Sequence, residues 1–356
     1  MAIEIVTPEG AGALTEFLRF QDEVYCDRSA RWPAFVPFQL GLLTGENPFA
    51  QDRRVRPFVA REDGRIVARA LAVIDLAHQR HWHESLGHLN MFEARPGARA
   101  ATRELMEAAC AWLAGQGATA VRAGFGSLES PFATEAYDLL PPSWLRQNPP
   151  YYHALLEEAG FEVERRFVDY KIAVRPELVA RWDRALDAGR RSGFEIVPLK
   201  DVPEDRRARE FTAVWNDAFQ AHWGQVPYRE AEVTALMRVF ALAGMDEVSV
   251  LAYLGTEAVG VLWIVPEMSA LAVLAPGRAL DPSERLNSLG IGVRQPARGR
   301  GLNLAMAAHA YLELARRGAT HLSYTLVLDD NWPSRRTAEK LGAEVCARYV
   351  AYRRGL

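Results

Sequence analysis

The fold is decided by the stretch Gly290-Ile291-Gly292-Val293-Arg294-Gln295-Pro296-Ala297-Arg298-Gly299-Arg300-Gly301-Leu302-Asn303. Its apolar, β-prone start ends in a proline, and apolar residues at helical spacing follow Gly301, which predicts a strand, a tight turn and a helix. The first turn of a helix carries unpartnered backbone N–H groups and the positive end of the helix dipole. Because Gly299 and Gly301 lack a Cβ, phosphates can approach these N–H groups closely. Arg298 and Arg300 add positive charge, so we interpret the turn as a cradle for a pyrophosphate.

The order of the glycines narrows the choice of ligand. A P-loop requires Gly-x-x-x-x-Gly-Lys-Ser/Thr, which this stretch lacks. A dinucleotide-binding turn requires a third glycine in an early βαβ unit, whereas this turn lies late in the chain. The spacing of Val293, four residues, Arg298, two residues and Gly301 resembles motif A of the GNAT acyltransferases (Gcn5-related N-acetyltransferases), which bind the pyrophosphate of acyl-coenzyme A. The alternative is a turn in which glycine serves only the backbone conformation.

This resemblance implies a site for acetyl-CoA or another acyl-CoA as co-substrate. The expected cofactor-binding residues are Ile291, Gly292, Val293, Arg298, Gly299, Arg300, Gly301, Leu302, Asn303, Asn331 and Ser334. In the family, the strand before the turn parts from its neighbour, and its free main-chain groups bind the pantetheine amides. Asn331 and Ser334 match the positions of motif B that contact the pantetheine arm. One departure is Asn303, where the family usually has Gly or Ala.

The resemblance further implies an N-acetyltransferase-like enzyme that transfers an acyl group, with acetyl expected, to the amine of a small molecule. The departing thiolate needs a proton. The family often supplies it from a Tyr just before Glu-Lys-x-Gly, but Ala338 occupies that place. The catalytic acid is therefore expected at Ser334 or Tyr324, or in water, and the candidate bases are Glu267, Glu284 and His222. The alternative is a non-catalytic protein that binds an acyl-CoA or a small ligand.

The chain repeats one large unit. Ala159-Gly160-Phe161-Glu162-Val163 corresponds to Leu341-Gly342-Ala343-Glu344-Val345, and Gly117-Ala118-Thr119 corresponds to Gly318-Ala319-Thr320. The predicted fold is α/β (α+β), with two tandem GNAT-like domains, each a twisted, mixed and mostly antiparallel sheet flanked by helices. The predicted bounds are 1–175 for the first domain, 176–192 for a helical linker and 193–356 for the domain with the acyl-CoA motif.

The first copy differs where the chemistry would lie. Opposite the glycine turn it reads Arg95-Pro96-Gly97-Ala98-Arg99-Ala100-Ala101, which places Ala101 near Gly301 and predicts a degenerate site. An extra loop at 127–148 is rich in proline and aromatic residues, and it is expected either to shape an acceptor pocket or to pack between the domains. Residues 26–54 show no clear period and are expected to form a long irregular loop.

Composition excludes several classes of function. The formal charge of −3 argues against nucleic acid as a partner, and three scattered cysteines show no disulfide or metal-ligand spacing. Histidines cluster between His78 and His88, but we expect a polar loop there and no metal. No long apolar segment and no signal peptide are apparent, so neither a membrane partner nor export is expected. The predicted location is the cytoplasm, and the sequence leaves the oligomeric state open.

Overall fold

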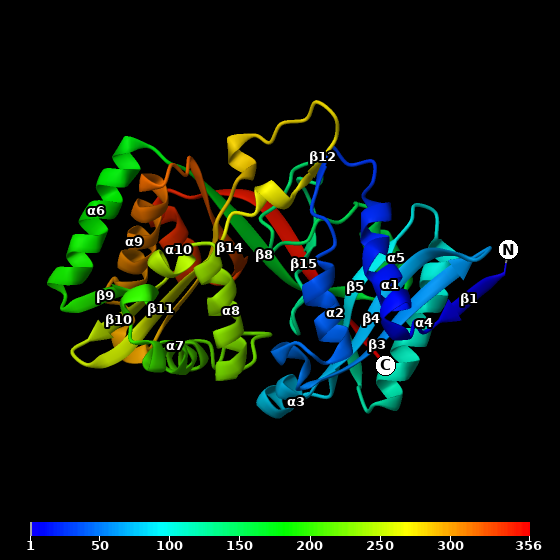
Figure 1. Cartoon of the computed structure of the whole chain (residues 1–356). Helices are drawn as coiled ribbons and strands as arrows, with labels where there is room; N and C mark the ends of the chain where they lie inside the picture. Colours follow the sequence, from blue (N-terminus) through cyan, green and yellow to red (C-terminus); the bar gives the residue numbers. More distant parts are fainter. Residues whose placement is uncertain (1) are drawn as a thin grey trace.

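The computed structural model describes residues 2–356, and Figure 1 shows two groups of helices and strands side by side. The first half contains β1 (Ile3–Val6), α1 (Gly10–Val24), β2 (Ala30–Arg31), α2 (Val36–Thr44), η1 (Pro48–Ala50), β3 (Arg53–Glu62), β4 (Arg65–Asp75), α3 (Leu76–Trp82), β5 (Leu86–Ala94), α4 (Arg99–Gly115), β6 (Ala120–Ala123), β7 (Phe132–Ala133), α5 (Tyr152–Glu158) and β8 (Glu162–Ala173).

The second half begins with the long helix α6. It contains α6 (Pro176–Arg191), β9 (Phe194–Pro198), η2 (Leu199–Asp201), α7 (Glu204–Ala218), α8 (Glu230–Leu242), η3 (Met245–Glu247), β10 (Val250–Leu254), β11 (Glu257–Val265), η4 (Ser269–Leu271), β12 (Val273–Leu274), η5 (Pro282–Glu284), β13 (Ser288–Val293), η6 (Gln295–Ala297), α9 (Leu302–Arg316), β14 (His321–Leu328), α10 (Trp332–Leu341) and β15 (Glu344–Gly355).

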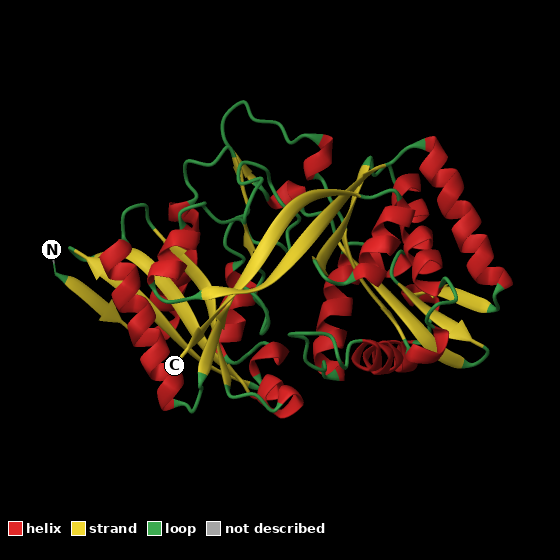
Figure 2. Cartoon of the chain, turned by 180° about the vertical axis from the view of Figure 1, so that it is seen from behind, coloured by secondary structure: helices red, strands yellow, loops and turns green. Residues whose placement is uncertain are grey.

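The two halves exchange their last strands. The larger sheet has nine strands in the order β1-β3-β4-β5-β6-β15-β8-β14, with β7 beside β15, and the second sheet has the order β13-β11-β10-β9. Thus β8 from the first half pairs with β14, and β15 from the second half pairs with β6, as in Tyr352 opposite Ala123. Figure 2 shows these two long strands crossing between the halves. The exchange joins the halves through backbone hydrogen bonds.

The predicted fold class is confirmed as a mixed α/β structure with helices flanking a mixed sheet. β5 and β6 are parallel, and the other ladders of both sheets are antiparallel. The predicted domain bounds stay predictions. We expected α6 only as a linker, but Trp182 of this helix is fully buried and its ring lies 5.5 Å from that of Tyr311. The helix therefore belongs to the core of the second half, because its apolar stripe needs a partner.

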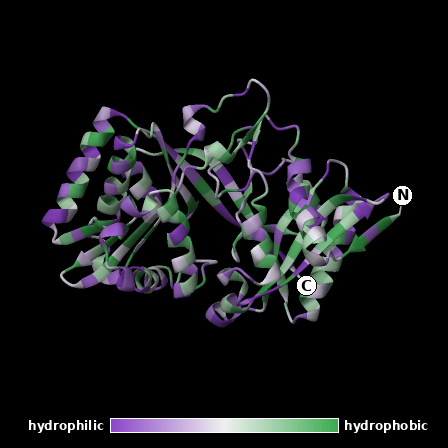
Figure 3. Cartoon of the chain, viewed as in Figure 1, coloured by the Kyte–Doolittle hydropathy of each residue, from purple (hydrophilic) through white to green (hydrophobic). Residues whose placement is uncertain are grey.

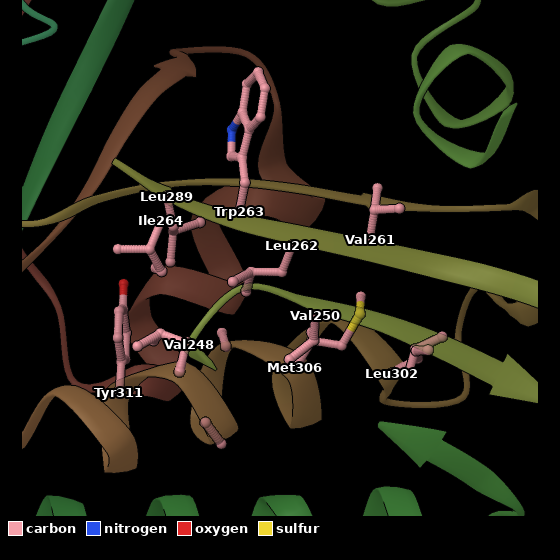
Figure 4. Close-up of a cluster of buried hydrophobic side chains, with 14 of the residues drawn as sticks. Val248, Val250, Val261, Leu262, Trp263, Ile264, Leu289, Leu302, Met306 and Tyr311 are labelled. Carbon is pink, nitrogen blue, oxygen red and sulfur yellow. The ribbon is translucent and has the colours of Figure 1, made fainter. Parts of the chain in front are cut away.

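The core of the second half lies between α9 and the four-stranded sheet. Figure 4 shows Met306, Tyr311 and Leu302 of α9 facing Leu262 and its neighbours, while the ring of Trp263 points to the opposite side of β11. This alternation is expected for successive residues of a strand. Trp263 therefore belongs to the other face of the sheet, which α7 and α8 cover.

Two predictions about local structure were wrong. A polar loop was expected for the histidines between His78 and His88, but His78 lies in α3 and His88 in β5, and both are buried. Residues 26–54 contain the helix α2, where an irregular loop was expected. Pro37 lies in its first turn, where proline is tolerated, and Gly45 ends it in the left-handed conformation. Its apolar residues surround the helix, so the sequence shows no single apolar stripe.

No helix in residues 2–356 is long and apolar enough to span a bilayer. Figure 3 shows hydrophilic and hydrophobic residues mixed along α6 and along the long strands β8 and β15, whereas β10 and β11 are largely hydrophobic.

Candidate functional site

The glycine turn is open at the N-terminus of α9. Gly299 and Gly301 have left-handed backbones, with φ of 77° and 82°, and no heavy atom lies within 4 Å of the Cβ that a larger residue would add. Gly301 is the N-cap of α9, and no side chain caps this helix. The first N–H groups of the helix, including those of Leu302 and Asn303, therefore adjoin a space that glycine keeps clear. A side chain at either glycine would project into the space where an anion would bind.

The two arginines of the turn are held by main-chain oxygens. Arg298 donates from Nε to the carbonyl oxygen of Val293 and from Nη2 to that of Ala218, both at 2.9 Å. Arg300 donates from Nη2 to the carbonyl oxygen of Ser192 at 3.0 Å. These bonds fix the turn against its surroundings. The positive charges remain beside the turn, and both the backbone N–H groups and the remaining guanidinium N–H groups can contact an anion.

A gap separates β13 from β14 beside this turn. β13 pairs with β11 and β14 pairs with β8, but in residues 2–356 the two strands form no ladder with each other. A backbone hydrogen bond from Ser323 N to Asn287 O, of 3.2 Å, joins them at one end. Toward the turn, Ile291 and Val293 have no strand beside their outer edge. Main-chain groups on such an edge can bind an extended ligand as an additional strand would.

β14 bends away from the gap at a bulge. Its register with β8 shifts between Tyr324 and Val327, and Leu326 has a left-handed φ of 55°. A residue with a branched side chain is strained in this conformation, and bulges often re-aim side chains next to functional sites. The bulge therefore marks the place where the two strands separate.

A chain of hydrogen bonds links the turn, α10 and β14. Asn303 donates from Nδ2 to Thr337 Oγ1 at 2.8 Å, which ties the start of α9 to α10. Asn331 caps α10 by accepting from the N–H of Ser334 at 3.2 Å. The Ser334 hydroxyl lies 3.0 Å from that of Tyr324, within hydrogen-bond distance. The two residues predicted as alternative acids are thus a pair, and both line the same cavity.

Tyr324 is a buried phenol beside this cavity. Burial raises the pKa of its hydroxyl to about 12, although the hydrogen bond with Ser334 acts in the opposite direction. The phenol is therefore protonated at neutral pH and has a proton to donate. Ala338, at the family's usual tyrosine position, is fully buried in α10.

The cavity follows the gap and has a volume of about 760 Å³. The glycine turn, Asn331 and Ser334 line one end, and Phe125 and Trp144 contribute from the first half. Most of the remaining wall is apolar or aromatic, namely Trp215, Phe219, Tyr228, Leu236, Phe240, Trp263, Val265, Leu289, Ile291, Val293, Leu326 and Val327. A largely apolar cavity with a few convergent polar groups is typical of a small-molecule site.

Two glycines in β13 let aromatic rings lie against this strand. A Cβ on Gly290 would lie 2.7 Å from Trp215 and would also overlap Trp263. A Cβ on Gly292 would lie 2.9 Å from Phe219. The sequence analysis missed the wall that α7 and α8 form. The alternating glycines were the available signal, because glycine inside a strand often marks close approach of another group.

The three candidate bases lie in different places. His222 lines the cavity, its Nδ1 has no hydrogen-bond partner within residues 2–356, and burial lowers its pKa. Glu267 is exposed and accepts from the N–H of Ser269. Glu284 is buried outside the cavity and forms an ion pair with Arg278. Of the three, His222 is placed to act on a ligand in the cavity.

In the first half, the glycine beside the corresponding helix N-terminus is Gly97, one residue before the N-cap Ala98 of α4, whereas Gly301 is itself the N-cap of α9. Ala101 was predicted to lie opposite Gly301, but it is fully buried inside α4. Gly97 instead precedes this helix with a φ of 83° and open space around it. In residues 2–356, no group of three or more His, Cys, Asp or Glu is arranged to hold a metal ion.

No family model matches the sequence. Among curated proteins, the chain is 24% identical over 374 residues to "Protein YghO" of Escherichia coli (strain K12), covering 95% of this chain and 92% of that protein. It is 25% identical over 252 residues to "Bacterial ceramide synthase" of Caulobacter vibrioides (strain NA1000 / CB15N), covering 70% of this chain and 65% of that protein.

Solved structures share the fold over almost the whole chain. A tandem GNAT protein from the clavulanic acid biosynthesis pathway has a TM-score of 0.58 at 14% identity, covering 99% of this chain and 98% of its own. A GCN5-related N-acetyltransferase from Sphaerobacter thermophilus has a TM-score of 0.56 at 15% identity, covering 99% and 95%. A GCN5-related glucosamine N-acetyltransferase region of a fungal multi-domain β-N-acetylglucosaminidase has a TM-score of 0.60 at 16% identity, with 99% of this chain but 38% of that chain covered. The resemblance to GNAT proteins is thereby confirmed at the level of the fold.

Proposed function

We propose that the protein is an acyl-CoA-dependent N-acyltransferase whose cofactor site lies in the second half. The observation that carries this proposal is the continuity of three features: an open glycine turn at a helix N-terminus, a gap between two strands, and a cavity along that gap. An acyl-CoA has parts that match them in the same order: a pyrophosphate, an extended pantetheine arm with two amides, and a thioester. The acceptor we propose is a small-molecule amine.

Binding of the cofactor would fall to main-chain groups. The first N–H groups of α9, around Gly299 and Gly301, would hold the pyrophosphate, and the free edge at Ile291 and Val293 would hold the pantetheine amides. Gly292 would keep this part of the strand free of a side chain. Arg298 and Arg300 would add positive charge and their remaining N–H donors, since only part of each guanidinium is engaged with carbonyl oxygens.

The chemistry requires a neutral amine and a proton for the departing thiolate. His222 is neutral at pH 7 because burial lowers its pKa, so it can accept a proton from the incoming amine. Tyr324 is protonated and hydrogen-bonded to Ser334, so this pair can deliver a proton to the sulfur. We assign Tyr324 as the acid and Ser334 as the group that orients or relays its proton.

The second candidate function is binding of an acyl-CoA or a small ligand without turnover. The alanine at position 338 favours it, since no acid stands there, and so does Asn303, whose amide is engaged with Thr337. The acid pair on β14 and α10 favours the enzyme. The two candidates differ in a single observable, the release of free thiol when an amine is supplied.

A thermal shift with coenzyme A tests the cofactor site. Ligand at one hundred times its dissociation constant stabilises the folded state by about 2.7 kcal/mol, which raises the melting temperature by roughly 5 °C for a protein of this size. We expect this shift in the natural protein and its loss in Gly301→Glu. The matched control is Gly97→Glu, since both glycines have left-handed backbones in open surroundings.

Gly97→Glu distinguishes loss of the binding site at α9 from a general effect of a charged residue at a helix N-terminus. Gly97→Glu introduces the same strain and the same charge at the other helix N-terminus, so it should keep the full shift. No shift with the natural protein, or equal loss in both variants, refutes a cofactor site at α9. A shift without thiol release across a panel of amines leaves the binding protein as the better description.

A further inference from the structure

We propose that the inner end of the cavity holds the hydrocarbon chain of an acyl group much longer than acetyl. This inference rests on the proposed function and specifies its donor substrate as a medium- or long-chain acyl-CoA. The inner end is defined here as the part lined by Leu236, Phe240, Trp263, Val265 and Leu289. The proposed acyl group is longer than the acetyl group that the family resemblance implies.

The inner end lies beside the end of β13 that is far from the glycine turn, on the face that α8 covers. The cavity lines β13 from Val293, next to the glycine turn, to Ser288 at the opposite end of the strand. Because Ser323 N bonds Asn287 O, the adjoining Tyr324 lies level with the Ser288 end, so a pantetheine arm that runs along β13 to Tyr324 would bring the thioester there. Val265 pairs with Ser288 on the neighbouring strand β11, so the inner end adjoins this position. We assign its apolar wall to a chain longer than acetyl.

The chemistry of the inner wall suits a hydrocarbon. Its side chains come from α8, β11 and β13 and continue directly into the hydrophobic core of the second half. The charged residues that line the cavity, Asp217 and Arg298, belong to the segments beside the glycine turn, and each is already partnered. An acceptor rich in hydroxyl or charged groups would find no partner at the inner end, whereas each buried methylene of a chain gains free energy there.

The acceptor has a separate route into the cavity. Phe125 and Trp144 of the first half and Gln225 of the α7–α8 loop line the part that faces the first half. Trp144 belongs to the extra loop 127–148 and is 40% exposed, so this side is accessible from solvent. Donor chain and acceptor would thus occupy different parts of the one cavity that Tyr324 and Ser334 also line. We therefore assign the inner end to the donor.

Binding of a thioester series without any amine tests the assignment. Free coenzyme A, acetyl-CoA and octanoyl-CoA are titrated into the full-length protein by calorimetry. Burial of one methylene corresponds to about fourfold in affinity. We expect octanoyl-CoA to bind on the order of a hundredfold more tightly than acetyl-CoA, which corresponds to burial of roughly three to four of its extra methylenes.

Two leucines of α8 provide matched variants. Leu236 lines the inner end, whereas Leu242 on the same helix is 92% exposed. Leu236→Trp fills the inner end and should bring octanoyl-CoA to the affinity of acetyl-CoA, while binding of free coenzyme A is kept as the measure of folding. Leu242→Trp should retain the hundredfold preference. If Leu236→Trp fails to fold, Leu236→Ala serves instead and should shift the preference toward chains longer than octanoyl.

The outcomes separate this inference from the proposed function. If neither coenzyme A nor any thioester binds, the proposed function is refuted and the inference with it. If coenzyme A binds but chain length has no effect, the inference is overturned while the cofactor site stands. A chain-length preference that survives in Leu236→Trp also overturns it, because the chain would then lie elsewhere.

Discussion

The two halves differ in what lies beside the corresponding strand of the repeated unit. In the second half, the outer edge of β13 borders an open gap and a cavity. In the first half, the corresponding strand β5 is covered by the protein's own loop 127–148. Met91 of β5 donates its N–H to Glu129 at 2.6 Å, and Asn90 donates to the carbonyl oxygen of Ser127 at 2.8 Å. A carboxylate of the loop thus binds the main chain where the second half has room for a ligand.

The covering loop is anchored by buried charges. Arg146 hydrogen-bonds the carbonyl oxygen of Phe92 and forms ion pairs with Glu129 at 3.0 Å and with Glu93 at 3.4 Å. Burial disfavours its charge, but the two carboxylates more than compensate and raise the pKa of Arg146. Tyr25 also donates to Glu93, at 2.6 Å. The comparison shows that one unit can keep its strand edge for a ligand while its copy uses that edge to hold an internal loop.

Among the variants that test this comparison, Arg146→Ala is expected to have the largest effect, a loss of stability. Removal of Arg146 leaves the part-buried Glu129 without its cation and leaves the buried Glu93 with only the more distant Arg69, at 4.0 Å, and breaking a buried pair typically costs about 3–5 kcal/mol of unfolding free energy. Urea denaturation measures this loss. The control is Arg348→Ala, because Arg348 forms an exposed pair with Glu135, and such pairs contribute about 0–1 kcal/mol.

Calorimetry on Arg146→Ala tests whether loop 127–148 alone prevents coenzyme A from binding to the first half. We expect coenzyme A to bind Arg146→Ala with one site per chain, as in the natural protein, because Glu129 still occupies the N–H of Met91. A second site in the variant would contradict the view that the first half has lost its own binding geometry.

The sequence predicted the glycine turn better than it predicted the arrangement of the halves. Gly299 and Gly301 predicted the turn because left-handed backbone and open approach both require glycine. The strand exchange was not predictable from local pattern. β8 and β15 follow nearly the same sequence, at Ala159-Gly160 and Leu341-Gly342, so either strand fits either sheet. A hydrophobic period fixes which face of a strand is buried, but it does not choose the neighbouring strand.

The cavity wall was missed for a related reason. Leu236 and Phe240 lie one helical turn apart on α8, and this spacing is the same for residues that face a core and for residues that face a cavity. The contact between Tyr324 and Ser334 was not predicted, since the two residues were treated as alternatives for the proposed acid. Their 3.0 Å contact depends on how β14 and α10 meet, which no local pattern encodes.

An intermediate effect is expected from loss of the phenol in the second half. Counted from Gly117 and Gly318, the first-half position that corresponds to Tyr324 is Ala123, so the copies differ here as well. Tyr324→Phe should lower the rate of thiol release with an acceptor amine by about a hundredfold or more, since general acids contribute about 10²–10⁴. The KM for the acyl-CoA should stay nearly unchanged.

Tyr170→Phe serves as the control for that variant. The Tyr170 ring lies 6.4 Å from that of Tyr324, and its hydroxyl accepts from Arg335 and does not line the cavity. A comparable fall in rate for both variants would show that packing around β14 matters and that the phenol proton does not.

The smallest effect concerns pH and a buried histidine of the first half. His88 on β5 is fully buried, and neither ring nitrogen has a partner within residues 2–356. Burial, with the charges of Arg122 and Arg53 nearby, lowers the pKa of His88 well below its ordinary value of about 6.5. The unfolded chain therefore binds a proton near pH 6.5 that the folded protein does not bind. The contribution of neutral His88 to the free energy of unfolding is fully present above about pH 6.5, and it falls by up to about 1.4 kcal/mol per pH unit below that pH.

His88→Leu should remove this contribution. In urea denaturation at pH 7.5 and 5.5, the natural protein is expected to lose more unfolding free energy on acidification than the variant does. Asp169 acts in the opposite direction, because burial raises the pKa of its carboxyl to about 7, so the folded protein binds its proton more tightly than the unfolded chain between pH 4 and 7. Since Asp169 is common to both proteins, the difference between their two pH responses isolates His88. An identical pH response of the two proteins would mean that water or a rearranged side chain hydrogen-bonds the His88 ring. The first half would then accommodate a charge beside β5 as readily as the second half accommodates a ligand beside β13.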